Sequence, residues 1–64
     1  MTAQQARLTQ VKEQPVVLLM DDGTTRRVYV YKYQRFSGFL VTAAGLVDVL
    51  QVAAWSLDLM PEFA

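Results

Sequence analysis

The fold class is decided by residues 15–23, which read Pro15-Val16-Val17-Leu18-Leu19-Met20-Asp21-Asp22-Gly23. Residues 16–20 form an apolar run of strand length, which predicts a strand covered on both faces. Pro15 ends any helix that precedes it and is tolerated at the first position of a strand. The Asp22-Gly23 pair is the strongest short signal for a hairpin turn. This stretch therefore predicts a strand, a tight turn and a second antiparallel strand.

The residues after the turn predict a long second strand, from Thr25 to about Gln34. Side chains alternate between the two faces of a strand, so Val28 and Val30 share one face with Arg26 and Lys32. The other face carries a stripe of arginines and tyrosines, namely Arg27, Tyr29, Tyr31, Tyr33 and Arg35. Because this strand must bend, one face need not stay on the same side throughout. Residues 37–38 mark a bend, and residues 39–42 predict a third strand followed by a tight connection at 43–45.

The two ends of the chain give signals of different strength. Thr2 and Gln5 have the spacing of a capping box, which predicts a helix over residues 3–12. Residues 46–60 fit either two further strands or one helix. Their valines favour strands, whereas Asp48, Gln51 and Trp55 fall near helical spacing. Pro61 ends either element. The sequence thus predicts one domain over residues 1–64, with a short helix and strands over about 15–60.

The composition indicates that copies of this chain associate. A chain of 64 residues buries only about 60% of its unfolded surface, so its stability is marginal. Small domains compensate with disulfides, metals or oligomerisation, and this chain has neither Cys nor His. Hydrophobic residues make up 53% of the chain, more than so small a domain hides alone. We therefore expect a homo-oligomer.

The same composition narrows the chemistry. Without Cys or His there is no thiolate or imidazole zinc site, no cysteine nucleophile and no histidine base. We expect no enzyme activity, no cofactor and no metal. Six basic and six acidic residues balance, so no strong overall field attracts nucleic acid. The polar N-terminal stretch has no signal-peptide pattern, which makes a cytoplasmic location the default. A single membrane span over residues 39–57 is a minor alternative, because Asp48 interrupts the apolar window.

The order of the expected elements and the spacing of their residues resemble those of the Sm-like family of RNA-binding proteins, which includes the bacterial RNA chaperone Hfq. Residues 15–23 resemble the family's first strand and its Asn/Asp-Gly turn. Ten residues beyond the glycine, family members carry an aromatic residue, a polar pair and a second aromatic. The same offset here gives Tyr33-Gln34-Arg35-Phe36, and residues 52–61 match the last strands and final proline. The resemblance implies a strongly bent, five-stranded SH3-like (Sm-fold) barrel, mostly β, with a short N-terminal helix.

The resemblance also implies a ring of five to seven copies that binds single-stranded RNA near a central pore. The implied RNA-binding residues are Arg35 and Phe36, to which the stripe adds Tyr33 and Arg27. Several positions depart from the family pattern. Val28 replaces the glycine of the bent strand, Gln34 the acidic residue and Gly38 an asparagine. Residues 52–54, Val-Ala-Ala, replace the Tyr-Lys-His or Arg-Gly segment. These changes affect the RNA site more than the fold.

Other readings of the same residues stay open. Phe36 is either a pore residue or a core residue, and the tyrosine stripe suits a subunit interface as well as RNA. The candidate interface residues are Tyr29, Tyr31, Trp55, Leu57 and Leu59. A structural or protein-interaction module that keeps the ring but has lost RNA binding is the main alternative function.

Overall fold

The computed structural model describes residues 1–59, which form one short helix and five strands. The elements run in this order: α1 (Ala3–Leu8), β1 (Gln14–Met20), β2 (Thr25–Gln34), β3 (Phe39–Thr42), β4 (Gly45–Asp48), the 3-10 turn η1 (Val49–Gln51) and β5 (Val52–Leu57). All neighbouring strands pair antiparallel. The prediction of a mostly-β domain with five strands and an N-terminal helix is confirmed.

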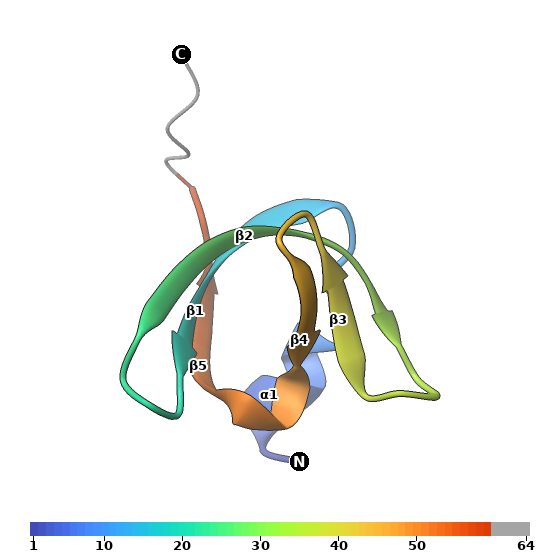
Figure 1. The fold of residues 1–64 in the computed structure, drawn as a ribbon, viewed down its shortest axis with the longest axis horizontal. Coiled ribbons are helices and arrows are strands. Elements are labelled where there is room, and N and C mark those ends of the chain that lie inside the picture. The colour runs from blue at the N-terminus through green and yellow to red at the C-terminus, as the bar shows by residue number, and fades with distance from the viewer. Residues whose placement is uncertain (60–64) are drawn as a thin grey trace.

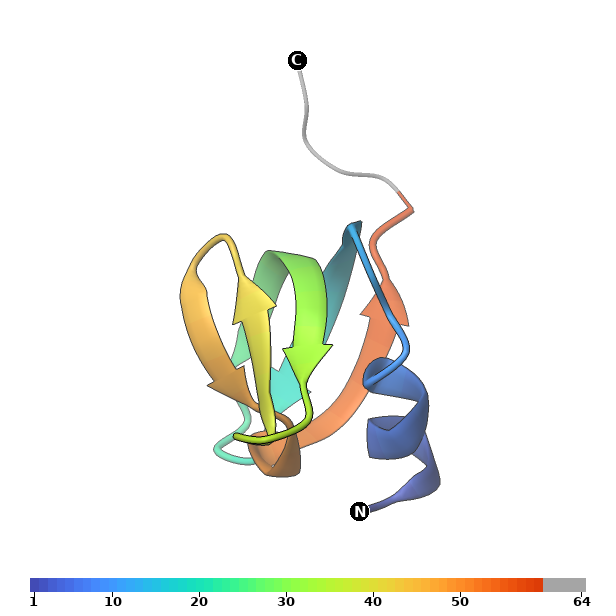
Figure 2. The same ribbon diagram turned by 90° about the vertical axis from the view of Figure 1, so that its right-hand side faces the viewer.

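The five strands form one sheet in the order β4-β3-β2-β1-β5. The sheet is strongly curved, because the long β2 arches over the molecule from one lower corner to the other (Figure 1). It has two ends: within residues 1–59, β4 and β5 each pair on one side only. The helix α1 and the strand β4 lie on opposite sides of the molecule (Figure 2).

The hydrophobic core lies on the concave face of the sheet, and the opposite, convex face is called the outer face. The buried residues of the core come from every element: Leu8, Val11, Val16, Leu18, Met20, Val28, Val30, Leu40, Val47, Val49 and Val52. In β1 burial alternates, so Leu18 is fully buried whereas the neighbouring Leu19 is 39% exposed. The prediction that both faces of this strand are covered is therefore wrong. No other element within residues 1–59 packs over the outer face of β1, so only one side of the apolar run is deeply buried.

A bulge lies within β2 at Tyr31. The pairing with β3 shifts register between Val30 and Lys32, so Tyr31 has no partner of its own. A bulge adds one residue to one strand and increases its local bend. It also reverses the faces of the residues that follow: Tyr33 pairs with the buried Leu40 and packs against the core. The strand β2 bends although it contains no glycine (Figure 1).

The structure shortens the predicted helix and decides the ambiguous C-terminal stretch. α1 ends at Leu8 rather than residue 12, because Thr9 caps it and Val11 turns into the core. Residues 46–57 form β4, η1 and β5, so the two-strand reading is confirmed over this part and the helical one is wrong. The predicted strand limit at residue 60 lies outside the described residues. None of the helices in the described part is long and apolar enough to cross a bilayer.

The two neighbouring leucines of β1 provide a matched test of this core. Leu18→Ala removes a fully buried side chain and should lower the free energy of unfolding by about 2–5 kcal/mol. Leu19→Ala truncates a partly exposed side chain on the outer face and should cost about 1 kcal/mol or less. Urea titrations at equal protein concentration measure both values. Equal losses for the two variants would contradict this assignment of the buried face.

Candidate nucleic-acid interface

The two sharpest candidates, Arg35 and Phe36, lie in the turn between β2 and β3. The Gly38 N–H donates to the Gln34 carbonyl at 2.9 Å, and Gly38 adopts a φ of +77°, which favours glycine. The Ser37 hydroxyl donates to Gln34 Oε1 and its oxygen accepts from the Phe39 N–H. This closed turn leaves the Phe36 ring fully exposed. The reading of Phe36 as a core residue is therefore wrong.

Basic side chains gather around this turn. One open hollow is lined by Lys32, Tyr33, Gln34, Arg35 and Phe36. A second hollow is lined by Thr9, Gln10, Lys12, Tyr33 and Arg35, and joins the end of α1 to the end of β2. Tyr33 and Arg35 line both. We call Lys12, Lys32, Tyr33, Arg35 and Phe36 the basic end of the molecule.

The chemistry of the basic end suits a flexible anionic chain with flat groups. Among the described residues, no acidic side chain lines either hollow. The ion pair found within residues 1–59 joins Arg27 to Asp58, so Lys12, Lys32 and Arg35 are not held by carboxylates there. Exposed cations bind phosphate oxygens, and an exposed aromatic ring offers a surface on which a base stacks. Three charges and two aromatic rings, of which that of Phe36 is fully exposed, thus meet at one end of a chain whose net charge is zero.

Arg27, the fourth RNA-binding candidate, lies away from this end. It stands on the outer face of β2 and reaches across β1 to Asp58. Its Nε lies 3.0 Å from Asp58 Oδ2 and its Nη2 lies 3.1 Å from Oδ1, which is a two-pronged ion pair. The Asp58 side chain is mostly buried. Arg27 therefore holds the end of β5 to the sheet, and the structure does not bring it together with Arg35.

The structure divides the candidate interface residues into two groups. Tyr29 and Tyr31 lie on the outer face in the middle of the sheet, where their rings meet edge-on with centroids 5.3 Å apart. Trp55 and Leu57 lie on the end strand β5, and the exposed Leu59 follows it. Trp55 is half-buried against the core, and its indole N–H donates to the Gln4 carbonyl at 2.7 Å. The bulge thus separates Tyr33 from the two exposed tyrosines of its stripe.

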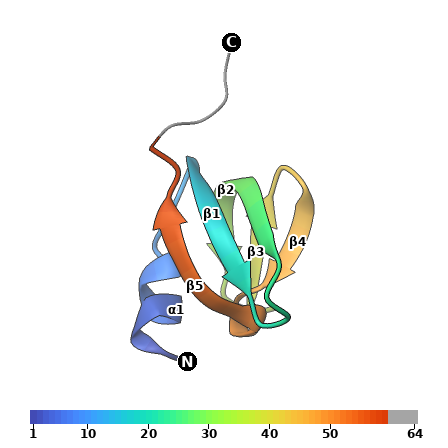
Figure 3. The same ribbon diagram turned by 90° about the vertical axis from the view of Figure 1, so that its left-hand side faces the viewer.

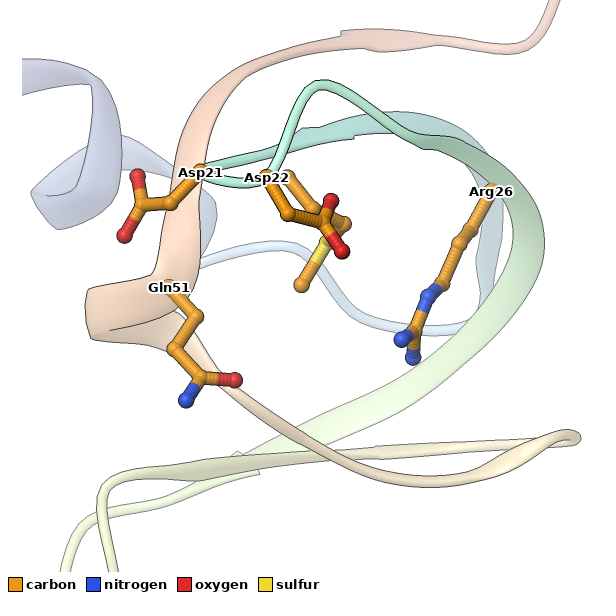
Figure 4. Close-up of a pocket in the computed structure, with 5 residues that line it drawn as sticks. Asp21, Asp22, Arg26 and Gln51 are labelled. Atoms are coloured by element: carbon orange, nitrogen blue, oxygen red, sulfur yellow. The ribbon is translucent and has the colours of Figure 1, made fainter.

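The opposite corner of the molecule is acidic. The β1–β2 turn carries Asp21 and Asp22, which line a cavity of about 220 Å³ together with Met20, Arg26 and Gln51 (Figure 4). Hydrogen bonds from the Thr24 hydroxyl and the Thr24 N–H, with the nearby charge of Arg26, lower the pKa of Asp22. No group of three or more His, Cys, Asp or Glu side chains that could hold a metal ion occurs among residues 1–59. Two carboxylates at this turn repel phosphate, so nucleic acid is disfavoured at this corner.

Sequence reasoning missed the junction between β4 and β5. Asp48 caps η1, with its Oδ1 accepting from the Leu50 N–H at 2.9 Å, and Leu50 is 59% exposed. The Val49 N–H donates to the Gly38 carbonyl at 3.3 Å, which ties the junction to the turn that carries Phe36. Residues 52–54 form the start of β5. The signal for this junction in the sequence was Asp48 itself, because an aspartate often caps a helical turn by accepting from the N–H two residues later.

Comparisons with protein-family models, with curated proteins and with solved structures found no match to this chain.

The acidic turn gives a prediction about proton binding. Thr24→Val removes the hydroxyl donor and should raise the pKa of Asp22 toward the ordinary value of an aspartate. Because the folded-state pKa is lowered, ionised Asp22 favours folding above its unfolded-state pKa. That contribution disappears as the pH falls through the folded-state pKa. A carboxyl NMR titration measures the shift, with Thr25→Val as the control that leaves the hydroxyl of Thr24 in place. An unchanged Asp22 pKa in Thr24→Val would refute the assigned cause.

Proposed function

We propose that this chain is a non-catalytic subunit of an Sm-like ring that binds single-stranded RNA through its basic end. The observation that carries the proposal is the fully exposed Phe36, held on a closed turn beside Arg35. An apolar ring exposed at a rigid turn contributes nothing to the core, so its place is explained by a ligand that stacks on it. Bases of any sequence provide that stacking surface.

The assembly part of the proposal rests on the two ends of the sheet. The Ala43 N–H donates to the Tyr29 carbonyl, so the backbone groups of Ala43 face β2. Because alternate residues face opposite sides of a strand, Thr42 and Leu40 face β4, where they pair with Gly45 and Val47. The backbone groups of Leu46 and Asp48, which alternate with these two residues of β4, therefore point away from β3. Leu46 is 60% exposed beside these groups. Leu57 on β5 is 41% exposed at the other end of the sheet. Unpaired edges with apolar side chains favour strand pairing between copies, and head-to-tail pairing closes into a ring when the rotation permits.

A helix followed by five antiparallel strands, with a long bent second strand, supports the Sm-fold reading of this sheet. In that reading β4 of one copy meets β5 of the next, and closure of the barrel is part of the proposal. Five to seven copies would repeat the basic end around one axis. Linked weak sites gain strongly in effective affinity, which allows a subunit of zero net charge to bind RNA.

The mass of the protein in solution tests the ring. Light scattering at micromolar concentration should give a mass of five to seven chains. Leu46→Lys places a charge on the exposed edge of β4 and should shift the protein to smaller species. Thr25→Lys adds the same charge at an exposed residue of β2, a strand paired on both sides, and should leave the mass unchanged. A wild-type mass of one chain would eliminate the ring.

RNA titration of the same protein tests the binding site. Phe36→Leu removes the ring while keeping an apolar side chain, and should weaken binding of uridine-rich or adenine-rich oligomers by about 5- to 150-fold. Phe36→Tyr keeps a stacking ring and should bind nearly as well. Arg35→Ala should lower the affinity and the salt dependence, whereas Arg7→Ala, on α1 and in neither hollow, should change little.

These titrations are made by fluorescence anisotropy at two salt concentrations. Binding that weakens steeply with salt is expected, because phosphate contacts release counterions. A ring that binds neither oligomer at low salt would favour the alternative of a structural or protein-interaction module.

A further inference from the structure

The helix α1 lies along the outer edge of β5. In Figure 3 the elements follow one another as α1, β5, β1 and β2, so α1 occupies the place that a sixth strand would take. Three polar contacts join the two elements. The Gln5 side-chain amide donates to the Val52 carbonyl at 3.1 Å, and the Gln4 Oε1 accepts from the Trp55 N–H at 3.2 Å. In the third contact, the Trp55 indole N–H donates to the Gln4 carbonyl.

The pairing of β5 with β1 shows which backbone groups α1 covers. The Asp58 N–H donates to the Pro15 carbonyl at 2.9 Å, so Asp58 points its backbone toward β1. Because alternate residues of an antiparallel strand face its two sides, Ser56 also faces β1, whereas Trp55 and Leu57 face the outer edge. The outward N–H of Trp55 is the group that Gln4 accepts from. The glutamines thus satisfy edge groups that a neighbouring strand would otherwise bind.

The covered and uncovered parts of β5 differ sharply. From Val52 to the Trp55 N–H, α1 supplies hydrogen-bond partners through its own glutamines. Beyond this point the Trp55 carbonyl and both backbone groups of Leu57 face outward with no partner from α1, and the Leu57 side chain is exposed. On the opposite end of the sheet, no α-helix in the described part of the chain covers Leu46 of β4.

We propose that α1 is an edge cover that confines strand pairing with a second copy to the Leu57 end of β5. The inference rests on the proposed assembly of copies through β4 and β5, and adds the segment at which they meet. With α1 docked, β4 of the second copy pairs beside Leu57. With the Gln4 side chain removed and α1 still held by Leu8 and Gln5, the Trp55 N–H becomes available, so the pairing segment extends from Leu57 to Trp55 and association strengthens.

The contact is suited to this role because Gln4 is separate from the anchors of α1. The buried Leu8 and Gln5 hold the helix against the core, and Gln5 is also part of the capping box with Thr2. The Gln4 side chain is exposed on α1 and bonds only to the β5 edge. Its side chain is therefore removable without removing the helix.

The variant Gln4→Ala tests the cover, with Gln10→Ala as the control on an exposed glutamine beyond α1. Amide hydrogen exchange in dilute protein should be about two- to tenfold faster at Trp55 in Gln4→Ala and unchanged in the control. Trp55 is the only tryptophan, so its fluorescence reports whether α1 stays docked. Analytical ultracentrifugation should then show association about two- to tenfold tighter for Gln4→Ala than for wild type.

Because the chain contains no cysteine, introduced pairs report which segments meet. With a short bis-maleimide, Leu46→Cys with Leu57→Cys should cross-link between copies. Leu46→Cys with Ala53→Cys should cross-link neither in the wild-type background nor with Gln4→Ala, because Gln5 keeps α1 over this part of β5, and a cross-link there would contradict the cover.

The outcomes separate this inference from the ring itself. If wild type assembles and Gln4→Ala associates equally or more weakly, the cover is refuted while the ring stands. If wild type is monomeric and Gln4→Ala assembles, the cover is supported and blocks pairing more completely than proposed. If neither protein assembles, both the ring and the cover are refuted.

Discussion

A single sheet with two ends leaves two rows of backbone groups without strand partners, and this constraint governs the rest of the molecule. Each unpaired N–H or C=O must find water, a side chain or another strand. At β5 the glutamines of α1 supply part of the answer, whereas at β4 no strand within residues 1–59 pairs with the outward groups of Leu46. The exposed leucines lie beside the open groups. The sheet ends therefore bear both on the stability of this chain and on the association that we propose for it.

The bulge at Tyr31 has the largest effect on the candidate site. It bends β2 and transfers Tyr33 to the core side, while Tyr29 and Tyr31 stay on the outer face. A continuous stripe would have formed one long aromatic surface on β2. The bulge instead places Tyr33 between two basic hollows at one end of the molecule. The unpaired Tyr31 thus decides which aromatic side chains of β2 lie on the same face.

Charge is separated along the molecule although its sum is zero. Lys12, Lys32 and Arg35 gather near the β2–β3 turn, whereas Asp21 and Asp22 occupy the β1–β2 turn at the opposite corner (Figure 1). Within a few ångströms the local field matters more than net charge, because salt screens charges more than about 10 Å apart. Arg27 takes no part in this separation, since Asp58 neutralises it on the outer face. Arginine therefore stands without a carboxylate partner among residues 1–59 at Arg35, and in an ion pair with Asp58 at Arg27.

Local chemistry determined much of this protein from its sequence alone. The apolar run 16–20 with Asp22-Gly23 determined the first hairpin, and Thr2 with Gln5 determined the start of α1. Composition indicated a domain too small to bury its apolar residues, and the structure leaves Leu46, Leu50 and Phe36 exposed. These features depend on neighbours in the chain, which a sequence shows directly.

Other features depend on residues far apart in the chain, and only the tertiary structure decided them. The bulge at Tyr31 depends on how β3 pairs with β2, and the end of α1 at Leu8 depends on Val11 entering the core. Arg27 met Asp58 across an intervening strand, and Gln4 met Trp55 through folding of the whole chain. Spacing along the chain cannot show a register shift or a contact across fifty residues, because many foldings share the same local preferences.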